Sequence, residues 1–159
     1  PPLSSALARL ICVITVPLLR YLGCVPVYHD YEGLKRTFQK SLDLLLAKRT
    51  LLIFPEDPQQ EQDPLTKMRP FQKGFVHIAE LYFENTGLAL KFYPIAIHQT
   101  HKVMVGTPIE HHPQAIPYRE RPRVRSLLEQ SIRHMYLEMS ASPNLPLTIP
   151  HIRTTSDHK

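Results

Sequence analysis

Residues 51–79 constrain the fold of this 159-residue chain more than any other stretch. They begin with an apolar run, Leu51 to Phe54, which stops at Pro55 and predicts a short buried strand over 50–54. A polar loop over 55–69 follows, with several prolines and no periodicity. Connections of this length in compact domains are usually functional or disordered. Because helical periodicity resumes directly afterwards, the sequence favours a functional loop.

Helical and extended patterns alternate on both sides of this stretch. Apolar residues recur at helical spacing over 31–48, 71–82 and 122–139, and extended segments are predicted at 24–27, 88–97 and 103–105. A first helix is predicted from Ser4 or Ser5 to near Pro17 or, with a kink, to Tyr21. Helices interleaved with short apolar strands are typical of an α/β domain. We expect one domain over 1–140 and a flexible, proline-rich tail over 141–159.

The charge balance favours anionic partners without naming them. The chain has 19 Lys and Arg against 14 Asp and Glu, a formal net charge of +5. Lipid headgroups, phosphorylated metabolites and nucleic acid are all compatible with this balance. Four arginines alternate over 119–125, but no interleaved aromatic residue supports base stacking. We therefore interpret them as a solvated helix start and expect no nucleic-acid partner.

The cysteines and paired histidines do not indicate a metal site. Cys12 and Cys24 lie among apolar or small residues, which predicts two buried thiols and neither a disulfide nor a zinc site. The pairs at 98 and 101 and at 111 and 112 are separated by odd intervals, which in an extended chain send side chains to opposite faces. We expect structural or solvent-exposed roles for these four histidines, no metal and no cofactor.

Two positions in residues 51–79 are candidate binding groups. Glu56 follows the predicted strand, where open α/β sheets usually bind ligands, although a plain surface acid would occupy the same place. Lys73 and Gly74 stand at a predicted helix start, an arrangement that often binds phosphate but also arises by chance. His29 and Asp30 are adjacent in an extended segment, so direct pairing between them is not expected.

Four segments, in this order, resemble conserved blocks of one enzyme family. FPE (54–56) with PFQKG (70–74) resembles the third block of the 1-acylglycerol-3-phosphate acyltransferase type of phospholipid-synthesis enzymes. GCVPVYH (23–29) is similar to the second block, and YPIAI (93–97) to the fourth. VGTPI (105–109) resembles the turn that often follows the fourth block. The ordered set spans most of residues 6–109.

The resemblance implies a fold, an activity and a location. The fold would be an α/β domain with a mixed sheet flanked by helices. The enzyme would be an O-acyltransferase of phospholipid biosynthesis, moving a fatty acyl group from acyl-CoA or acyl carrier protein to a hydroxyl of a lysophospholipid or glycerol phosphate. It would work at the cytoplasmic face of a membrane and need no cofactor beyond the acyl donor.

The resemblance also implies which residues bind substrate. Glu56 would hold the glycerol-phosphate acceptor, and Lys73 and Gly74 would shape the phosphate side of the pocket. The full implied set is Phe54, Pro55, Glu56, Lys73, Gly74 and His29.

The sequence departs from the family pattern at three places. No histidine here has aspartate at the fifth following position, so the catalytic His-Asp block is expected upstream of Pro1 and no catalytic residue is assigned. His29 stands where the family usually has arginine, and Asp57 where it has glycine, with Gln59 and Gln60 replacing part of a Thr-Arg-Ser stretch. These departures leave open a different acceptor lipid. They also leave open an inactive lipid-binding or scaffolding module of the same fold.

Overall fold

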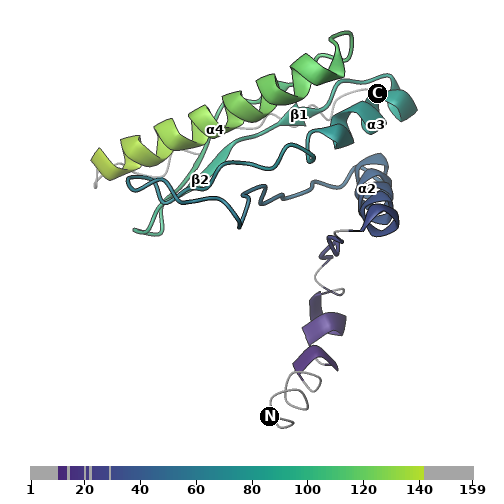
Figure 1. The fold of residues 1–159 in the computed structure, drawn as a ribbon, viewed down its shortest axis with the longest axis horizontal. Coiled ribbons are helices and arrows are strands. Elements are labelled where there is room, and N and C mark those ends of the chain that lie inside the picture. Colours follow the sequence, from purple (N-terminus) through teal and green to yellow (C-terminus); the bar gives the residue numbers. More distant parts are fainter. Residues whose placement is uncertain (1–10, 14, 20, 22, 29, 142–159) are drawn as a thin grey trace, which may run out of the picture. The chain divides into compact units, whose positions relative to one another are not determined.

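The computed structural model describes residues 11–13, 15–19, 21, 23–28 and 30–141, coloured along the chain in Figure 1. The chain divides into two compact units, Pro1–Leu51 and Leu52–Lys159, called unit 1 and unit 2 below. The expectations of one domain over 1–140 and of a flexible tail stay predictions, and residues 142–159 lie outside the described part.

Unit 1 contains a short helical segment and the helix α2 (Tyr31–Leu46). Residues 11–13 and 15–19 are helical, so the helix continues past Pro17, as in the kinked alternative. Gly23 has a φ of +80°, which favours glycine and ends the segment in a turn. Cys12 and Cys24 are both exposed, so the prediction of buried thiols is wrong. None of the helices in the described ranges has the length and apolar character needed to cross a bilayer.

The helix α2 is shorter and less buried than its sequence predicts. It begins after Asp30, whose carboxylate accepts a hydrogen bond of 2.9 Å from the N–H of Gly33 as a side-chain N-cap. The predicted apolar stripe is only partly covered, because Leu42 is buried whereas Leu34 and Leu46 are exposed. Asp30 was expected in the preceding extended segment, and its role as an N-cap was not predicted.

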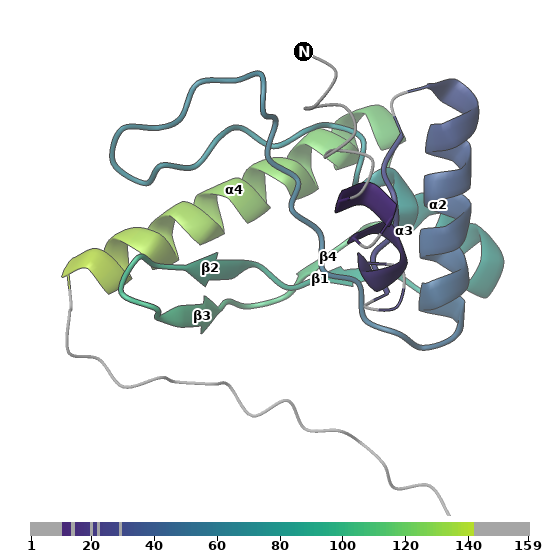
Figure 2. The ribbon, with the colours of Figure 1, turned by 90° about the horizontal axis from the view of Figure 1, so that it is seen from below.

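Unit 2 has the helices α3 (His77–Thr86) and α4 (Pro117–Ala141). Between them lie the strands β1 (Lys91–Phe92), β2 (Ile95–Ile97), β3 (Val103–Val105) and β4 (Ile109–Glu110). Strand β1 pairs with β4 and strand β2 with β3, both antiparallel, so residues 91–110 form one interrupted hairpin. At the interruption, the N–H of Gly106 donates to the carbonyl of Pro94 at 2.9 Å. Figure 2 shows the β2–β3 part running along α4.

The predicted fold class is confirmed in its coarse form, a mixture of helices and strands. The predicted extended segment 88–97 contains β1 and β2, which are separated at Pro94, and the predicted segment 103–105 is β3. Gly87, with a φ of +70°, ends α3 in a turn. The predicted strand over 50–54 is wrong: Leu52, Ile53 and Phe54 are exposed and pair with no described strand. The strands that are present pair only in antiparallel twos, and no central mixed sheet is formed among the described residues.

The core of unit 2 is organised by the buried face of α4. Val124 and Leu128 pack with Met68, Phe71 and Val76, and a second cluster joins Met135 and Met139 to Ala96. The helix begins at Pro117 rather than near Pro122, since proline suits the first turn, and the exposed Pro122 lies inside it. Leu127, one of the apolar residues of the predicted helical pattern over 122–139, is 39 % exposed.

This difference between adjacent leucines gives a stability prediction. Leu128→Ala should lower the free energy of unfolding of unit 2 by about 2–5 kcal/mol, because it removes buried contacts and leaves a cavity. Leu127→Ala, the matched control, should cost less than about 1 kcal/mol. Urea denaturation followed by circular dichroism measures both, and equal costs would contradict the assigned helix face.

Candidate functional site

The candidate site lies at the base of the loop that begins at Pro55. Glu56 and Phe71 form an isolated antiparallel bridge. The N–H of Gln72 donates to the carbonyl of Pro55 at 2.8 Å, and the N–H of Asp57 donates to the carbonyl of Pro70 at 2.9 Å. This bridge sets the arm with Phe54, Pro55 and Glu56 opposite the arm that leads to Lys73 and Gly74. Five of the six predicted binding residues therefore belong to one loop base.

The middle of this loop is fixed to α4 by Asp63. One carboxylate oxygen of Asp63 accepts from the N–H groups of Leu65 at 3.0 Å and Thr66 at 2.8 Å. The other oxygen pairs with Arg133 at 2.5 Å. Hydrogen bonds from the Thr66 N–H and from Arg133 lower the pKa of Asp63 to about 2. Figure 2 shows the loop along one side of α4 and the β2–β3 hairpin along the other.

The second arm of the loop is also held by α4. The N–H of Phe71 donates to Oε1 of Glu129 at 2.6 Å, and the ring of Phe71 is buried in the core. This ring meets Phe75 edge to face, with centroids 6.2 Å apart. The backbone on both sides of Lys73 is thus attached to packed side chains, which preorganises the loop base.

The charged side chains at the loop base are free to meet a ligand. Glu56 and Lys73 are exposed, and neither forms a hydrogen bond or ion pair with any described residue. Phe54 is 77 % exposed. Asp57, the acid in place of the family glycine, instead accepts from the N–H of Gln59 at 3.0 Å and so shapes the turn.

Lys73 and Gly74 do not open a helix, as the sequence predicted, but precede α3 by one turn. The N–H of His77 donates to the carbonyl of Gly74 at 3.1 Å, and that of Ala79 to Val76 at 3.0 Å. The N–H groups of the first residues of α3 are therefore already used within this turn. Those of Lys73, Gly74 and Phe75 bond to no described residue, which moves the available donors onto the turn itself.

The sixth predicted binding residue, His29, lies outside the described residues.

A charged cluster next to the loop base was not predicted. Arg121 of α4 donates from Nε and Nη2 to the two carboxylate oxygens of Glu80 in α3, at 2.6 and 2.5 Å. His77 Nδ1 lies 2.8 Å from Glu80 and 3.1 Å from Arg121. Burial raises the pKa of Glu80, but the hydrogen bonds from Arg121 and His77 outweigh it and the pKa is lowered overall. The pair joins two helices, and only the His77–Glu80 spacing of three residues was visible in the sequence.

A second such cluster surrounds the buried carboxylate of Glu120. It accepts from Arg123 at 2.6 and 2.7 Å and from the N–H of His112 at 2.8 Å. These bonds lower the pKa of Glu120 to about 2, and the bond with Arg123 has the largest effect. His111 is also buried, and burial lowers its pKa. The interpretation of the 119–125 arginines as a solvated helix start is therefore wrong for Arg121 and Arg123.

His98 has a structural role, as expected. His98 contacts Thr100 at 2.8 Å through Nδ1 and Ser140 at 3.0 Å through Nε2, and its ring lies on Tyr136. Across the described part of the chain, no three His, Cys, Asp or Glu side chains gather as a metal site would require.

Comparisons with protein families, curated proteins and solved structures find no match to this chain. The resemblance to acyltransferases therefore depends on the four sequence segments alone.

The low pKa of Glu120 predicts an acid-dependent loss of stability. The unfolded-state pKa is near 4.5 and the folded-state pKa is about 2, so the stabilisation is complete above pH 4.5 and is lost as the pH falls towards 2. We expect the free energy of unfolding to decline across this window, and to decline less steeply in Glu120→Gln. Denaturation at a series of pH values measures the slope. Glu138→Gln, an exposed position on the same helix, should keep the original slope.

Proposed function

We propose that the loop base of unit 2 is the acceptor-binding site of an acyltransferase. The reaction would transfer a fatty acyl group from acyl-CoA or acyl carrier protein to a hydroxyl of a lysophospholipid or glycerol phosphate. The observation that carries this proposal is the Glu56–Phe71 bridge, which opposes the FPE arm and the KG arm that the resemblance singles out. The two arms lie at opposite ends of the loop in the sequence. A binding site that uses residues of both arms requires them to be adjacent in space, and the bridge makes them so.

Each group has a role in this proposal. The ammonium of Lys73 and the N–H groups of Gly74 and Phe75 bind the phosphate of the acceptor. The carboxylate of Glu56 accepts a hydrogen bond from a glycerol hydroxyl. Phe54 and Pro55 give an apolar surface beside it, which suits a lipid acceptor.

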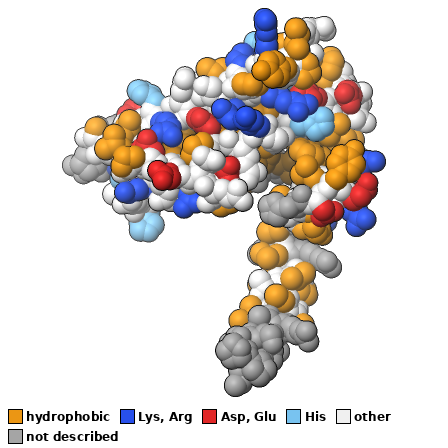
Figure 3. Space-filling view, viewed as in Figure 1, with side chains coloured by type: hydrophobic (Ala, Val, Ile, Leu, Met, Phe, Trp, Pro, Cys, Tyr) orange, Lys and Arg blue, Asp and Glu red, His pale blue; other side chains and the backbone are white. Residues whose placement is uncertain are grey.

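Unit 1 supports the membrane contact in this proposal, whereas the cytoplasmic face is what the resemblance implies. Its helical segment exposes several apolar side chains, namely Ile11, Val13, Val16, Leu18 and Leu19. Figure 3 shows hydrophobic side chains, in orange, along this part of the chain. An exposed apolar patch of this kind commonly marks a membrane or protein contact. The finer fold, a mixed sheet flanked by helices, is part of the same proposal. In that fold the segment around Ile53, which is exposed and pairs with no described strand, would be one of the strands of the sheet.

The proposal concerns acceptor binding and assigns no catalytic residue. Acyl transfer to a hydroxyl needs a base, which the family supplies as a histidine oriented by an aspartate. No histidine of the 159 residues is followed by aspartate at the fifth position. The same observation favours the second candidate function, a lipid-binding or scaffolding module without turnover.

The phosphate role of Lys73 predicts a specific loss of binding. Lys73→Gln should weaken binding of glycerol 3-phosphate at the loop base by about 10- to 100-fold, since a charge-assisted contact of this kind contributes about 1.5–3 kcal/mol. Isothermal titration calorimetry measures the effect. Lys67→Gln removes the same charge from another exposed position of the loop and should change the affinity less than about twofold. A similar effect of both variants would mean that general charge, not the loop base, binds the ligand.

The role of Glu56 predicts a different pattern. Glu56→Gln should weaken binding of glycerol 3-phosphate but leave the affinity for inorganic phosphate unchanged or slightly higher, because the ester alone has a hydroxyl for this carboxylate and the lost charge no longer repels the anion. Titration of both ligands against both proteins gives the comparison. Equal losses for the two ligands would argue against a contact with the glycerol hydroxyls.

Turnover separates the two candidate functions. The protein expressed from its complete coding sequence is incubated with radiolabelled acyl-CoA and a panel of lysophospholipids, and the lipid products are separated. A labelled diacyl product supports the acyltransferase. Retained lipid binding without any labelled product supports the module without turnover.

A further inference from the structure

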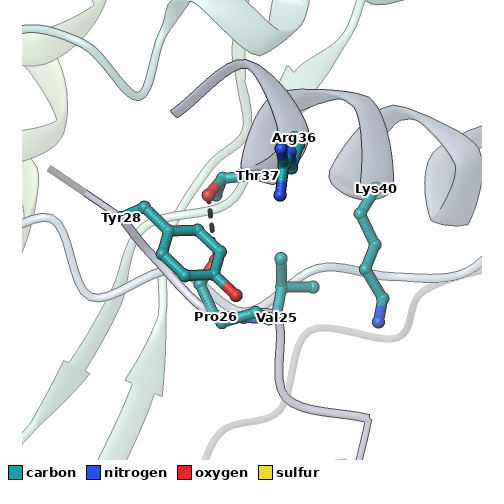
Figure 4. Close-up of a pocket in the computed structure, with 6 residues that line it drawn as sticks. All are labelled: Val25, Pro26, Tyr28, Arg36, Thr37 and Lys40. Atoms are coloured by element: carbon teal, nitrogen blue, oxygen red, sulfur yellow. Dashed lines mark hydrogen bonds between the residues drawn. The ribbon is translucent and has the colours of Figure 1, made fainter. Parts of the chain in front are cut away.

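Unit 1 contains a pocket that the proposed function does not use. It lies between the extended segment 24–28 and the helix α2 and has a volume of about 340 Å³. Six side chains line it, as Figure 4 shows: Val25, Pro26, Tyr28, Arg36, Thr37 and Lys40. Ligand sites in proteins begin at about this size, near 300 Å³.

The pocket is built by close contact between the segment and the helix. The hydroxyl of Thr37 lies 2.9 Å from the carbonyl of Pro26 and 3.0 Å from that of Gly33, so it attaches the segment to α2. Gly33 faces Tyr28 directly, and a Cβ at this position would overlap the Cβ of Tyr28. The absence of a side chain at Gly33 therefore lets Tyr28 lie against the first turn of the helix.

Two cations border this pocket, Arg36 and Lys40 of α2. Arg36 and Lys40 are one helical turn apart on α2, so they share a face. Both are exposed, and neither forms a hydrogen bond or ion pair with a described residue. The acid of α2 nearest in sequence to Lys40, Asp43, accepts from the amide of Gln39 at 3.0 Å instead. Like charges at this spacing repel, and a bound anion between them would relieve the repulsion.

We propose that this pocket binds the phosphate group of a phosphate ester. A guanidinium presents paired N–H donors that match two phosphate oxygens, and an ammonium one turn away contacts a third. A carboxylate has only two oxygens, which the guanidinium alone would occupy. Val25, Pro26 and the ring of Tyr28 form the apolar wall for the organic part of the ester. Both a soluble phosphate ester and a lysophospholipid headgroup carry this chemistry.

This inference is independent of the loop base, because every residue that lines the pocket belongs to unit 1. The test is therefore made in the Lys73→Gln background, where the proposed site of unit 2 is weakened. A failure of either proposal then leaves the other intact.

The experiment compares two double variants of the full chain. Arg36→Gln with Lys40→Gln removes both pocket cations, whereas Lys35→Gln with Arg49→Gln removes one lysine and one arginine from exposed positions outside the pocket. Binding of glycerol 3-phosphate is measured by calorimetry, with glycerol as the uncharged comparison. We expect the pocket variant to lose affinity by about tenfold or more and the control variant by less than about twofold. Glycerol should not bind.

A third variant tests the shape of the pocket without changing its charge. Gly33→Ala displaces Tyr28 from the helix and also crowds the Asp30 carboxylate that caps it, whereas alanine has the higher helix propensity, so far-ultraviolet circular dichroism is recorded to check that the helical signal is retained. Binding should nevertheless weaken several-fold. Unchanged affinity in this variant and in the pocket double variant would overturn the proposal, as would equal losses in the two double variants or no binding by the parent protein.

Sedimentation with vesicles identifies the source of the phosphate. Phosphatidylcholine vesicles with and without lysophosphatidic acid are compared, and glycerol 3-phosphate is added as a competitor. Binding that needs the lysolipid and the two pocket cations assigns the pocket to a lipid headgroup. Calorimetric binding of the soluble ester with no cation-dependent vesicle binding assigns it to a soluble phosphate ester.

Discussion

The buried face of α4 is the surface on which unit 2 is assembled. Its apolar residues cover the core, and three of its polar side chains each hold a distant segment of backbone or loop. Glu120 accepts from the N–H of His112, Glu129 from the N–H of Phe71, and Arg133 binds Asp63. Two of these contacts satisfy part-buried backbone N–H groups. Because a buried N–H without a partner costs about 1–3 kcal/mol, they favour one position of the backbone on the helix. Glu129 and Arg133, one turn apart on α4, thereby place the second arm and the middle of the loop.

Sequence patterns predicted local structure well and pairing poorly. Apolar periodicity indicated α2, α3 and the strand at 103–105, because each depends on residues close in sequence. The apolar run at Leu51 to Phe54 had the composition of a strand, but a strand also needs a neighbouring strand with which to pair. In this region only Glu56, two residues after the run, forms a bridge, and its partner is Phe71. The candidate binding residues of the loop were predicted one by one. Their approach through the bridge was not, nor was the contact of Asp63 with Arg133, which are 70 positions apart in the sequence.

The distribution of usable charge also differs from the composition. In the sequence the arginines at 119–125 form the most basic cluster, and the net charge of +5 counts them equally with all others. In the structure Arg121 and Arg123 are bound to Glu80 and Glu120, so their fields are largely cancelled. Arg36, Lys40 and Lys73 have no such partners among the described residues. The net charge alone therefore does not show which cations can attract an anion, because that requires knowing which carboxylate meets which cation.

The loop of unit 2 is held at two separate places, and the stretch between them is free to vary. The bridge at Glu56 closes the base, and Asp57 accepts hydrogen bonds from the N–H groups of Gln59 and Gln60 in the turn that follows. Asp63 attaches the middle of the loop to α4, and the exposed residues 61–62 lie between these attachments. Adding residues there lengthens only one short span, and the entropy of closing a span grows slowly with its length. Related chains with a longer or shorter loop at this point would keep Glu56 and Lys73 at the same distance from each other in space. The segment is thus a place where a peptide tag or reporter can be inserted without moving the candidate site.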